Sequence, residues 1–174
     1  TTRFDSRHKP VANTGWMPKL GLGRKSWANR SMKFSELFYS IQGEGQLIGV
    51  PSVFFRTSFC NLRCIWCDTP YTSWEPEDKD ISVEDAVDAI LAHNCKQVVI
   101  TGGEPMLNQA GIVTVLDALA ARDNLPSYIT IETNGTQAPR QELADRISRY
   151  EGYGSRELFW SVSPKLSLSG EAWD

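Results

Sequence analysis

Residues 52–67 read S-V-F-F-R-T-S-F-C-N-L-R-C-I-W-C, and this stretch decides the fold. Its first six residues are mostly β-branched or aromatic, which predicts a short buried strand. Three cysteines follow within eight residues, at Cys60, Cys64 and Cys67. A strand that leads directly into such closely spaced thiols predicts a metal site at the end of the strand rather than a disulfide framework.

Strand and helix patterns alternate after the cysteines. Ser82 followed by Asp85 is a helix-start signal, and the apolar residues after it recur at helical spacing. The same reasoning places helices near residues 82–94, 112–119 and 140–149, and strands at 97–100, 128–131 and 158–162. A β-α-β-α-β-α-β order predicts an α/β fold with a parallel sheet and right-handed crossovers. A further strand-like run, residues 34–41, precedes it.

Polar or glycine-rich motifs follow the later predicted strands. They are Thr101-Gly102-Gly103-Glu104-Pro105, Glu132-Thr133-Asn134 and Ser163-Pro164-Lys165. Each motif alone is typical of a turn. Because the carboxyl ends of parallel strands share one rim, where α/β proteins place their chemistry, we expect these motifs and the cysteine loop to lie together.

Charge is distributed unevenly along the chain. Residues 1–33 carry eight basic residues and one acid, a net charge of +7, whereas the remainder carries 10 basic and 20 acidic residues. We therefore expect a basic, irregular N-terminal extension over residues 1–32 and one domain over residues 33–174. An acidic domain without a broad basic face is not expected to bind nucleic acid.

The remaining composition predicts a soluble protein. Apolar residues make up 41% of the 174 positions, enough for one core. No apolar run approaches the roughly 18–20 residues that span a bilayer, and the basic extension lacks the hydrophobic block of a secretory signal. Cysteines grouped in this way suit a reducing compartment, so we expect a cytoplasmic protein that binds no membrane.

Two metal sites are compatible with the cysteine loop. Three thiolates can hold three corners of a cubane iron-sulfur cluster and leave its remaining iron open to a ligand. A structural zinc ion would need a further protein ligand, and neither His8 nor His93 is close in sequence. Cys95 begins its predicted strand at the opposite end, so we expect it to be a small buried residue.

The C-x3-C-x-aromatic-C loop with Gly-Gly-Glu-Pro after the next strand resembles the radical S-adenosylmethionine superfamily. This resemblance implies a partial (β/α) barrel, here truncated, with parallel strands and helices on the outside. It implies a [4Fe-4S] cluster on Cys60, Cys64 and Cys67 and S-adenosylmethionine bound at the open iron, with Glu104 accepting from its amino group. The matching S-adenosylmethionine contacts are Trp66, Cys67, Asp68, Gly103, Glu104, Glu132, Thr133, Asn134, Ser163, Pro164 and Lys165.

Within the superfamily, Gln42-Gly43-Glu44-Gly45, Arg56, Cys67-Asp68-Thr69 and the Ser-Pro-Lys motif resemble the 7-carboxy-7-deazaguanine synthase family. That family converts 6-carboxy-5,6,7,8-tetrahydropterin to 7-carboxy-7-deazaguanine with loss of ammonia, on the route to queuosine. The resemblance implies Mg2+ on the hydroxyl of Thr69. The residues that match substrate contacts are Ile41, Gln42, Gly43, Glu44, Arg56 and Thr101.

The resemblance extends from about residue 34 to 166, whereas members of the family continue beyond the point where this chain ends. The domain is therefore expected to be incomplete at its C-terminus. The resemblance also implies an electron donor such as flavodoxin or ferredoxin and a homodimer, and it names no side chain as general base, because the cofactor carries the radical chemistry. The alternatives are a glycyl-radical enzyme activase, which shares the cysteine loop, and a zinc-stabilised interaction module.

Overall fold

The computed structural model describes residues 30–76, 79–122 and 124–170, so most of the basic extension lies outside the described residues. A five-stranded sheet runs through the described part in the order β2-β3-β5-β6-β7. Its strands are β2 (Glu36–Ile41), β3 (Pro51–Thr57), β5 (Gln97–Gly102), β6 (Tyr128–Thr133) and β7 (Glu157–Val162). The four strands from β3 to β7 are parallel, which confirms the predicted α/β class.

Strand β2 is the exception to the parallel arrangement. It pairs antiparallel with β3, with Glu36 opposite Arg56 and Ile41 opposite Pro51. The sequence predicted parallel strands throughout and did not anticipate this reversal. Its cause is the short connection over residues 42–50, because a parallel crossover needs about a dozen residues or more.

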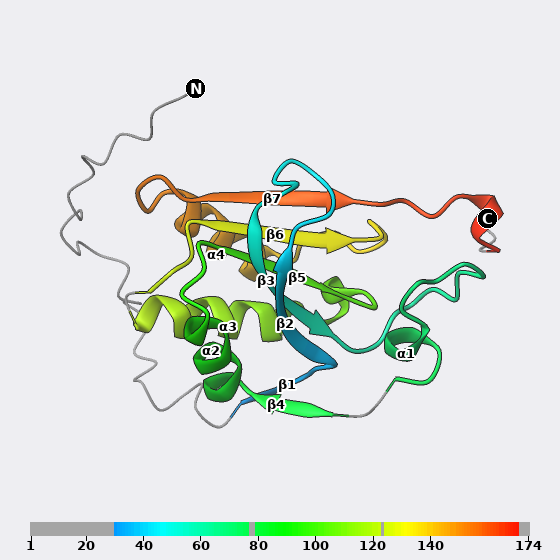
Figure 1. The fold of residues 1–174 in the computed structure, drawn as a ribbon, viewed down its shortest axis with the longest axis horizontal. Helices are drawn as coiled ribbons and strands as arrows, with labels where there is room; N and C mark the ends of the chain where they lie inside the picture. Colours follow the sequence, from blue (N-terminus) through cyan, green and yellow to red (C-terminus); the bar gives the residue numbers. More distant parts are fainter. Residues whose placement is uncertain (1–29, 77–78, 123, 171–174) are drawn as a thin grey trace.

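Three helices cover one face of the sheet and build the core. They are α2 (Val83–Ala92), α3 (Gln109–Ala121) and α4 (Gln141–Glu151), and they lie beside one another in Figure 1. Alternate strand residues such as Phe55, Ile100 and Ile131 point into the same buried cluster as apolar residues of α2 and α3. The predicted helices outside the sheet are thereby confirmed, although Figure 1 shows an open sheet rather than a closed barrel.

The predicted start of α2 is confirmed in detail. Ser82 has extended backbone, and its hydroxyl accepts a hydrogen bond from the backbone N–H of Asp85 at 3.0 Å. Such a cap satisfies one of the unpaired N–H groups of the first helical turn. The helix ends at Ala92, and His93 next to it stacks on Tyr39 of β2.

Several short elements were not predicted. They are β1 (Ser31–Lys33), α1 (Pro70–Ser73), β4 (Asp80–Ser82) and the 3-10 turns η1 (Pro105–Asn108) and η2 (Ser167–Ser169). Strands β1 and β4 form a separate antiparallel pair, and Met32 is buried in the core. Strand β1 therefore crosses the expected boundary between residues 32 and 33.

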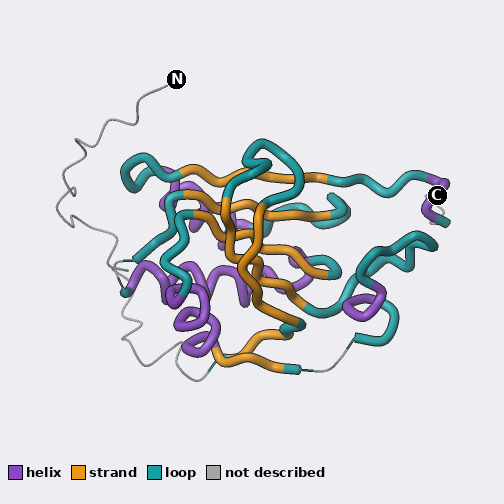
Figure 2. The backbone as a smooth tube through the Cα atoms, viewed as in Figure 1, coloured by secondary structure: helices purple, strands orange, loops and turns teal. Residues whose placement is uncertain are grey.

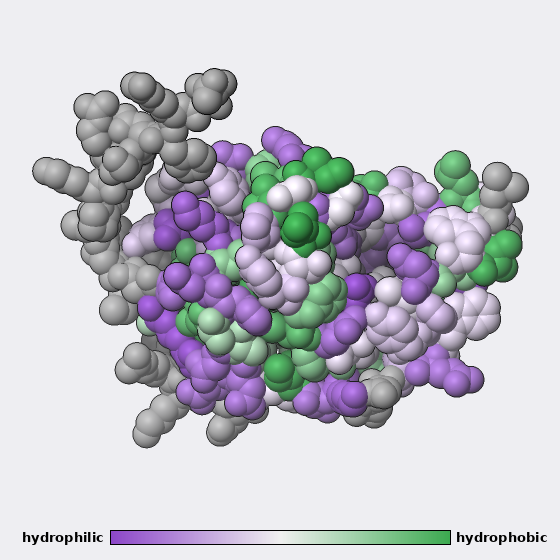
Figure 3. Space-filling view, viewed as in Figure 1, coloured by the Kyte–Doolittle hydropathy of each residue, from purple (hydrophilic) through white to green (hydrophobic). Residues whose placement is uncertain are grey.

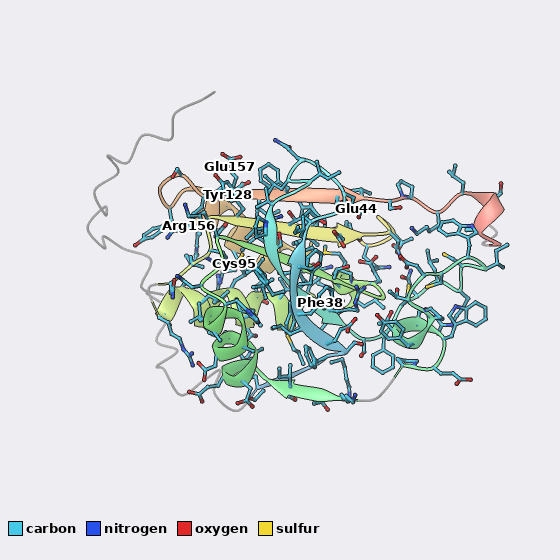
Figure 4. The ribbon with its side chains drawn as sticks, in the orientation of Figure 1. Phe38, Glu44, Cys95, Tyr128, Arg156 and Glu157 are labelled. Carbon is cyan, nitrogen blue, oxygen red and sulfur yellow. The ribbon has the colours of Figure 1, made fainter. Side chains whose placement is uncertain are left out.

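All four parallel strands point toward the same side of the molecule. In Figure 1 their arrowheads face the region that holds α1, and Figure 2 shows loops gathered at that end, while the three long helices lie toward the other. Cys95, Tyr128, Arg156 and Glu157 lie at the opposite end of the strands (Figure 4). The arrangement brings the loops after β3, β5, β6 and β7 to one rim, as the parallel order requires.

Cys95 differs from its predicted environment. Its side chain is only partly buried, and its thiol donates to the carbonyl of Pro51 at 2.9 Å. The residue precedes β5 at the amino end of the strands, where it packs against the edge of the core and stays partly exposed.

The surface carries exposed apolar side chains on and beside β2. Tyr39, Ile41 and Ile48 are more than half exposed, and Figure 3 shows apolar side chains over the middle of this face. Within the described ranges, no helix has the length and apolar character to cross a bilayer.

Candidate active site

A cavity of about 300 Å³ opens at the carboxyl ends of the parallel strands. The loops after β3, β5, β6 and β7 and the hairpin after β2 all contribute to its wall. Its lining residues are Glu44, Arg56, Cys60, Leu62, Cys64, Trp66, Cys67, Asp68, Thr69, Ser73, Thr101, Gly102, Gly103, Glu132, Thr133, Asn134, Ser161, Ser163 and Lys165. Motifs that are far apart in the sequence therefore meet around one space.

The cysteine loop is held in shape mainly by backbone hydrogen bonds. Phe59, which enters the loop with a positive φ of 75°, donates its N–H to Thr72 of α1 and accepts from the N–H of Glu104, both at 2.8 Å. Further along, the N–H of Ile65 donates to the carbonyl of Ser169 at 2.9 Å. These bonds connect the loop to α1, to the residues just after β5 and to η2. The backbone that carries the three cysteines is therefore fixed at several points.

The surroundings of the Cys60 thiol favour its neutral form. Burial raises the pKa of the Cys60 thiol, and the nearby acidic groups Glu104, Cys64 and Cys67 raise it further, although the N–H of Leu62 opposes them. Without a metal this thiol therefore stays protonated at neutral pH. A metal that binds its sulfur must displace the proton, and the positive charge of the metal then relieves the repulsion between thiolates.

A cluster and a single metal ion place different demands on the positions of the three cysteines. In the part of the chain that the structure describes, no set of three His, Cys, Asp or Glu side chains converges on one metal position. The three sulfurs nevertheless line the same cavity. A cubane cluster presents a separate iron to each cysteine, so its ligands need not converge on one point.

Two glycines at the carboxyl end of β5 let its backbone pass close to the cysteine loop. Gly102 has a φ of 151°, and a Cβ atom there would overlap the backbone oxygen of Thr57. A Cβ atom at Gly103 would overlap the carbonyl of Phe59 at the start of the cysteine loop. The Gly-Gly pair is therefore required by close backbone packing, and it leaves Gly103 on the cavity wall.

Glu104 lies behind the cavity wall rather than in it. Its side chain is fully buried, and Oε1 accepts from the hydroxyl of Thr133 at 2.7 Å and from the N–H of Met106 at 2.9 Å. Oε2 accepts from the N–H of Asn134 at 2.7 Å. The sequence assigned this carboxylate to an amino group of the ligand, whereas in the structure it joins the loop after β5 to the loop after β6.

Asn134 continues this connection to the cysteine loop. Its side-chain amide donates to Oδ1 of Asn61 at 3.1 Å and lies 3.9 Å from Sγ of Cys60, and its Oδ1 accepts from the hydroxyl of Thr136 at 2.7 Å. Asn61 in turn donates to Thr136 at 2.8 Å. The loop after β6 is thus hydrogen bonded to the loop that carries the cysteines.

Arg56 reaches the cavity from the end of β3. Its Nε donates to Oε1 of Glu36 at 2.9 Å, and its guanidinium lies over the ring of Phe38. The hydroxyl of Tyr71 donates to the same oxygen of Glu36 at 2.7 Å, and burial together with this carboxylate raises the pKa of Tyr71. Because Nε is held from behind, the two terminal nitrogens of Arg56 are the groups left for a bidentate contact with an anion.

Polar side chains with oxygen and nitrogen atoms form the rest of the wall near the cysteines. The hydroxyl of Thr69 lies 3.4 Å from Oδ1 of Asp68, so two oxygens of the kind that Mg2+ prefers stand side by side. On the other side, Nζ of Lys165 lies 5.1 Å from the ring centroid of Trp66 and donates to Ser163 at 2.9 Å.

Some residues predicted for the site do not line the cavity. Ile41 is 63% exposed, and its register places it on the helix side of the sheet. Gln42 is buried and donates to Glu132 at 3.0 Å, so it supports a wall residue. Three further residues predicted for the site are absent from the lining of the cavity: Gly43, Glu104 and Pro164.

The structure adds three wall residues that the sequence did not single out, Leu62, Ser73 and Ser161, and it also places Gly102 of the predicted glycine motif on the wall. Strand alternation could have identified Ser161, because it lies two positions before Ser163. No local pattern identifies Ser73, because α1 is too short to show periodicity.

Comparison with known proteins decides the family. The family model described as the Radical SAM superfamily matches residues 54–156, which include the cysteine loop and the motifs after β5 and β6. The chain belongs to the radical SAM superfamily.

Similar proteins give a narrower relation within this radical SAM superfamily. The chain is 45% identical over 139 residues to the 7-carboxy-7-deazaguanine synthase of Rhodopirellula baltica, covering 80% of this chain and 47% of that protein. It is 50% identical over 107 residues to the protein of the same name from Halobacterium salinarum, covering 61% and 40%. The chain therefore spans about half the length of the curated relatives it matches.

A solved structure supports the same relation. The crystal structure titled "Crystal structure of QueE from Escherichia coli" superposes with a TM-score of 0.61 at 28% identity, covering 83% of this chain and 64% of that chain. Together with the sheet and helices described above, this confirms the predicted partial barrel of the radical SAM type.

The cofactors of a radical SAM protein are a [4Fe-4S] cluster and S-adenosylmethionine, and the residues of this cavity fit them. Three thiols line one wall, where burial and the nearby acidic groups raise the pKa of Cys60. Beside them stand a backbone exposed by Gly103 and polar side chains from the loops after β6 and β7. Such donors and acceptors suit an amino acid and a ribose.

Proposed function

We propose that this chain is the radical SAM part of a 7-carboxy-7-deazaguanine synthase, a lyase that converts 6-carboxy-5,6,7,8-tetrahydropterin to 7-carboxy-7-deazaguanine and ammonia. One observation carries the proposal most directly. Arg56 and Thr69, which match substrate and magnesium contacts of that family, line the same cavity as the three cysteines. The names of the relatives support it.

In this proposal Cys60, Cys64 and Cys67 hold the cluster. When bound, the reduced cluster and S-adenosylmethionine supply the one-electron chemistry that starts hydrogen abstraction from the substrate. The chain contributes position and shielding. The buried and half-buried cysteines lie on a loop that is hydrogen bonded to its neighbours, which keeps the reactive groups at one end of the cavity. The carboxyl ends of the strands close the cavity on the side of the sheet and exclude water there.

The contacts to S-adenosylmethionine are assigned to the remaining rim motifs. Backbone at Gly103 and the side chain of Asn134 suit the methionyl group, and Trp66 and Asp68 suit the adenine. Glu132, Ser163 and Lys165 lie on the adjoining wall and suit the ribose and the carboxylate. The buried carboxylate of Glu104 supports this set by holding Asn134 in place.

The substrate is assigned to the part of the cavity between Arg56 and the hairpin after β2. The terminal nitrogens of Arg56 suit the substrate carboxylate, since a guanidinium binds a carboxylate through two parallel hydrogen bonds. Thr101 and Glu44 line the same region and suit the polar edge of a pterin. Thr69 is proposed to ligate Mg2+, with substrate and water as further ligands.

The proposal extends to the setting of the reaction. A reductant is needed, and we assign this role to a one-electron carrier such as flavodoxin or ferredoxin in the cytoplasm. We further propose a homodimer, a basic extension that precedes β1, and a radical SAM domain that begins with β1 rather than at residue 33 and runs to residue 174.

The decisive experiment supplies the anaerobically reconstituted chain with S-adenosylmethionine, a reductant, Mg2+ and the carboxytetrahydropterin. Mass spectrometry is expected to show 7-carboxy-7-deazaguanine. Formation of 5'-deoxyadenosine without that product would retain the superfamily and overturn the substrate assignment. Zinc in place of iron in the reconstituted chain would overturn both the proposed cluster and the proposed substrate. Turnover only with a glycyl-radical partner protein would favour an activase.

A further inference from the structure

Ser73 is the last residue of the short helix α1 and lies directly beside one of the proposed cluster ligands. Its hydroxyl oxygen is 3.5 Å from Sγ of Cys67, and both residues line the cavity. The side chain is only 2% exposed. A polar group buried to this extent needs a hydrogen-bond partner, and among the described residues that partner is the sulfur of Cys67.

The backbone of α1 keeps this hydroxyl in position. Thr72, next to it, donates its side chain to the carbonyl of Thr69 at 2.8 Å, and its own carbonyl accepts from Phe59 at 2.8 Å. The helix is therefore tied both to the start of the cysteine loop and to Thr69, the second residue after its last cysteine. These bonds hold the backbone of α1 beside Cys67, so Ser73 can lose the contact only by rotating its own side chain.

The state of the cysteine decides the direction of the hydrogen bond. In the free thiol, either the sulfur or the hydroxyl can donate. A cysteine that ligates iron is a thiolate without a proton, so only the serine hydroxyl can donate. Binding of the cluster would thus convert an ambiguous contact into a charge-assisted one.

We propose that Ser73 is a positioning residue that donates a hydrogen bond to the Cys67 thiolate and raises the reduction potential of the cluster. Hydrogen bonds to ligand sulfurs are among the factors that set cluster potentials. Reduction adds negative charge to the cluster and its sulfurs, so a donor stabilises the reduced state more than the oxidised one. The inference rests on the proposed function only for the cluster on the three cysteines, and the substrate plays no part in it.

The other contacts to the cysteine sulfurs are less suited to a test by substitution. Cys60 accepts from the backbone N–H of Leu62 at 3.4 Å, which substitution cannot remove simply, and Asn134 lies 3.9 Å away. Thr69 is also 3.9 Å from Cys67, and its hydroxyl is assigned to Mg2+. Among these contacts of Cys60 and Cys67, Ser73 gives the shortest one from a side chain.

The test is a redox titration of the reconstituted full chain, followed by electron paramagnetic resonance, without S-adenosylmethionine or substrate. Ser73→Ala is expected to bind a full complement of iron and to show a lower midpoint potential than the unmodified chain. Ser73→Thr keeps a hydroxyl and is expected to restore most of the potential. Ser52→Ala is the matched control, because it removes a buried hydroxyl at the other end of β3.

Each outcome has a defined meaning. An unchanged potential in Ser73→Ala, or an equal shift in Ser73→Ala and Ser73→Thr, would overturn the inference and leave the proposed cluster intact. Should Ser73→Ala fail to retain iron, Ser73→Gly removes the same hydroxyl without adding apolar volume and takes its place. An unmodified chain that forms no iron-sulfur chromophore would overturn the proposed cluster itself and this inference with it.

Discussion

The backbone N–H of Asn134 donates a 2.7 Å hydrogen bond to the buried carboxylate of Glu104. Through this bond and the one from the hydroxyl of Thr133, one side chain from the loop after β5 holds the start of the loop that follows β6. Asn134 then bonds to Asn61 between the cysteines. The three loops around the cavity are therefore connected through a residue that does not itself reach the cavity.

Replacing Glu104 with Gln is expected to lower the free energy of unfolding by about 2–3 kcal/mol, because a charged acceptor is lost and an amide N–H faces another donor. The effect should be seen by urea denaturation without any ligand. Glu157→Gln, an exposed change at the opposite end of the strands, is the control. Unchanged stability in Glu104→Gln together with weaker S-adenosylmethionine binding would instead show a direct contact with the ligand.

Cysteine substitutions should separate the cluster ligands from the fourth thiol. Alanine at Cys60, Cys64 or Cys67 is expected to abolish the brown chromophore and most of the bound iron after anaerobic reconstitution, because each would remove one corner ligand. Cys95→Ala should retain both, since Cys95 lies at the other end of the strands (Figure 4). Loss of iron in Cys95→Ala with retention in any of the other three would contradict the assignment.

Arg56→Lys should impair binding of the carboxylated substrate. A lysine cannot make a bidentate contact and cannot keep the same bond to Glu36, so KM for the pterin is expected to rise about tenfold or more. Formation of 5'-deoxyadenosine without substrate should be unaffected. Arg122→Lys, which alters a guanidinium at the end of α3, is the control. An equal loss of the substrate-free reaction would place Arg56 at S-adenosylmethionine instead.

Tyr150 should make stability depend on alkaline pH. Its side chain is fully buried with its hydroxyl donating to Pro126 at 3.0 Å, and burial raises its pKa well above the ordinary value of 10.0. Below pH about 10 the phenol is neutral in both folded and unfolded chains, so its contribution is fully present. Above that pH only the unfolded chain ionises, so this contribution to stability falls as pH rises.

Tyr150→Phe isolates this effect. The variant is expected to be less stable at neutral pH by about 1–3 kcal/mol, because the carbonyl of Pro126 loses its partner. Its unfolding free energy should fall less steeply than that of the unmodified chain between pH 9 and about 11 in urea titrations. Parallel pH profiles of the two proteins would contradict a raised pKa at Tyr150.

Local patterns were enough for the alternating part of the fold. The apolar runs at Val98–Ile100 and Ile129–Ile131 are short and buried, the helix signal at Ser82 is a side-chain cap, and both kinds of information lie within a few residues. The grouping of the rim motifs also followed, because parallel strands leave their carboxyl ends together.

Long-range pairing explains what could not be predicted. Strands β1 and β4 are three residues each, and their pairing joins Ser31 to Ser82 across the chain. The role of Glu104 depends on donors from β6 that no local pattern identifies. Motif resemblance places a residue at a site, but the direction of its side chain is decided by neighbours from other strands.

The close contact between Gly103 and Phe59 limits how the site can be altered. Because their backbones touch with no room for a side chain, neither loop can change its path unless the other changes with it. A chimera that received only the cysteine segment from a distant relative would collide with the resident Gly-Gly turn. We therefore expect the cysteine loop and the Gly-Gly turn to be exchanged together, both in engineered chimeras and during evolution.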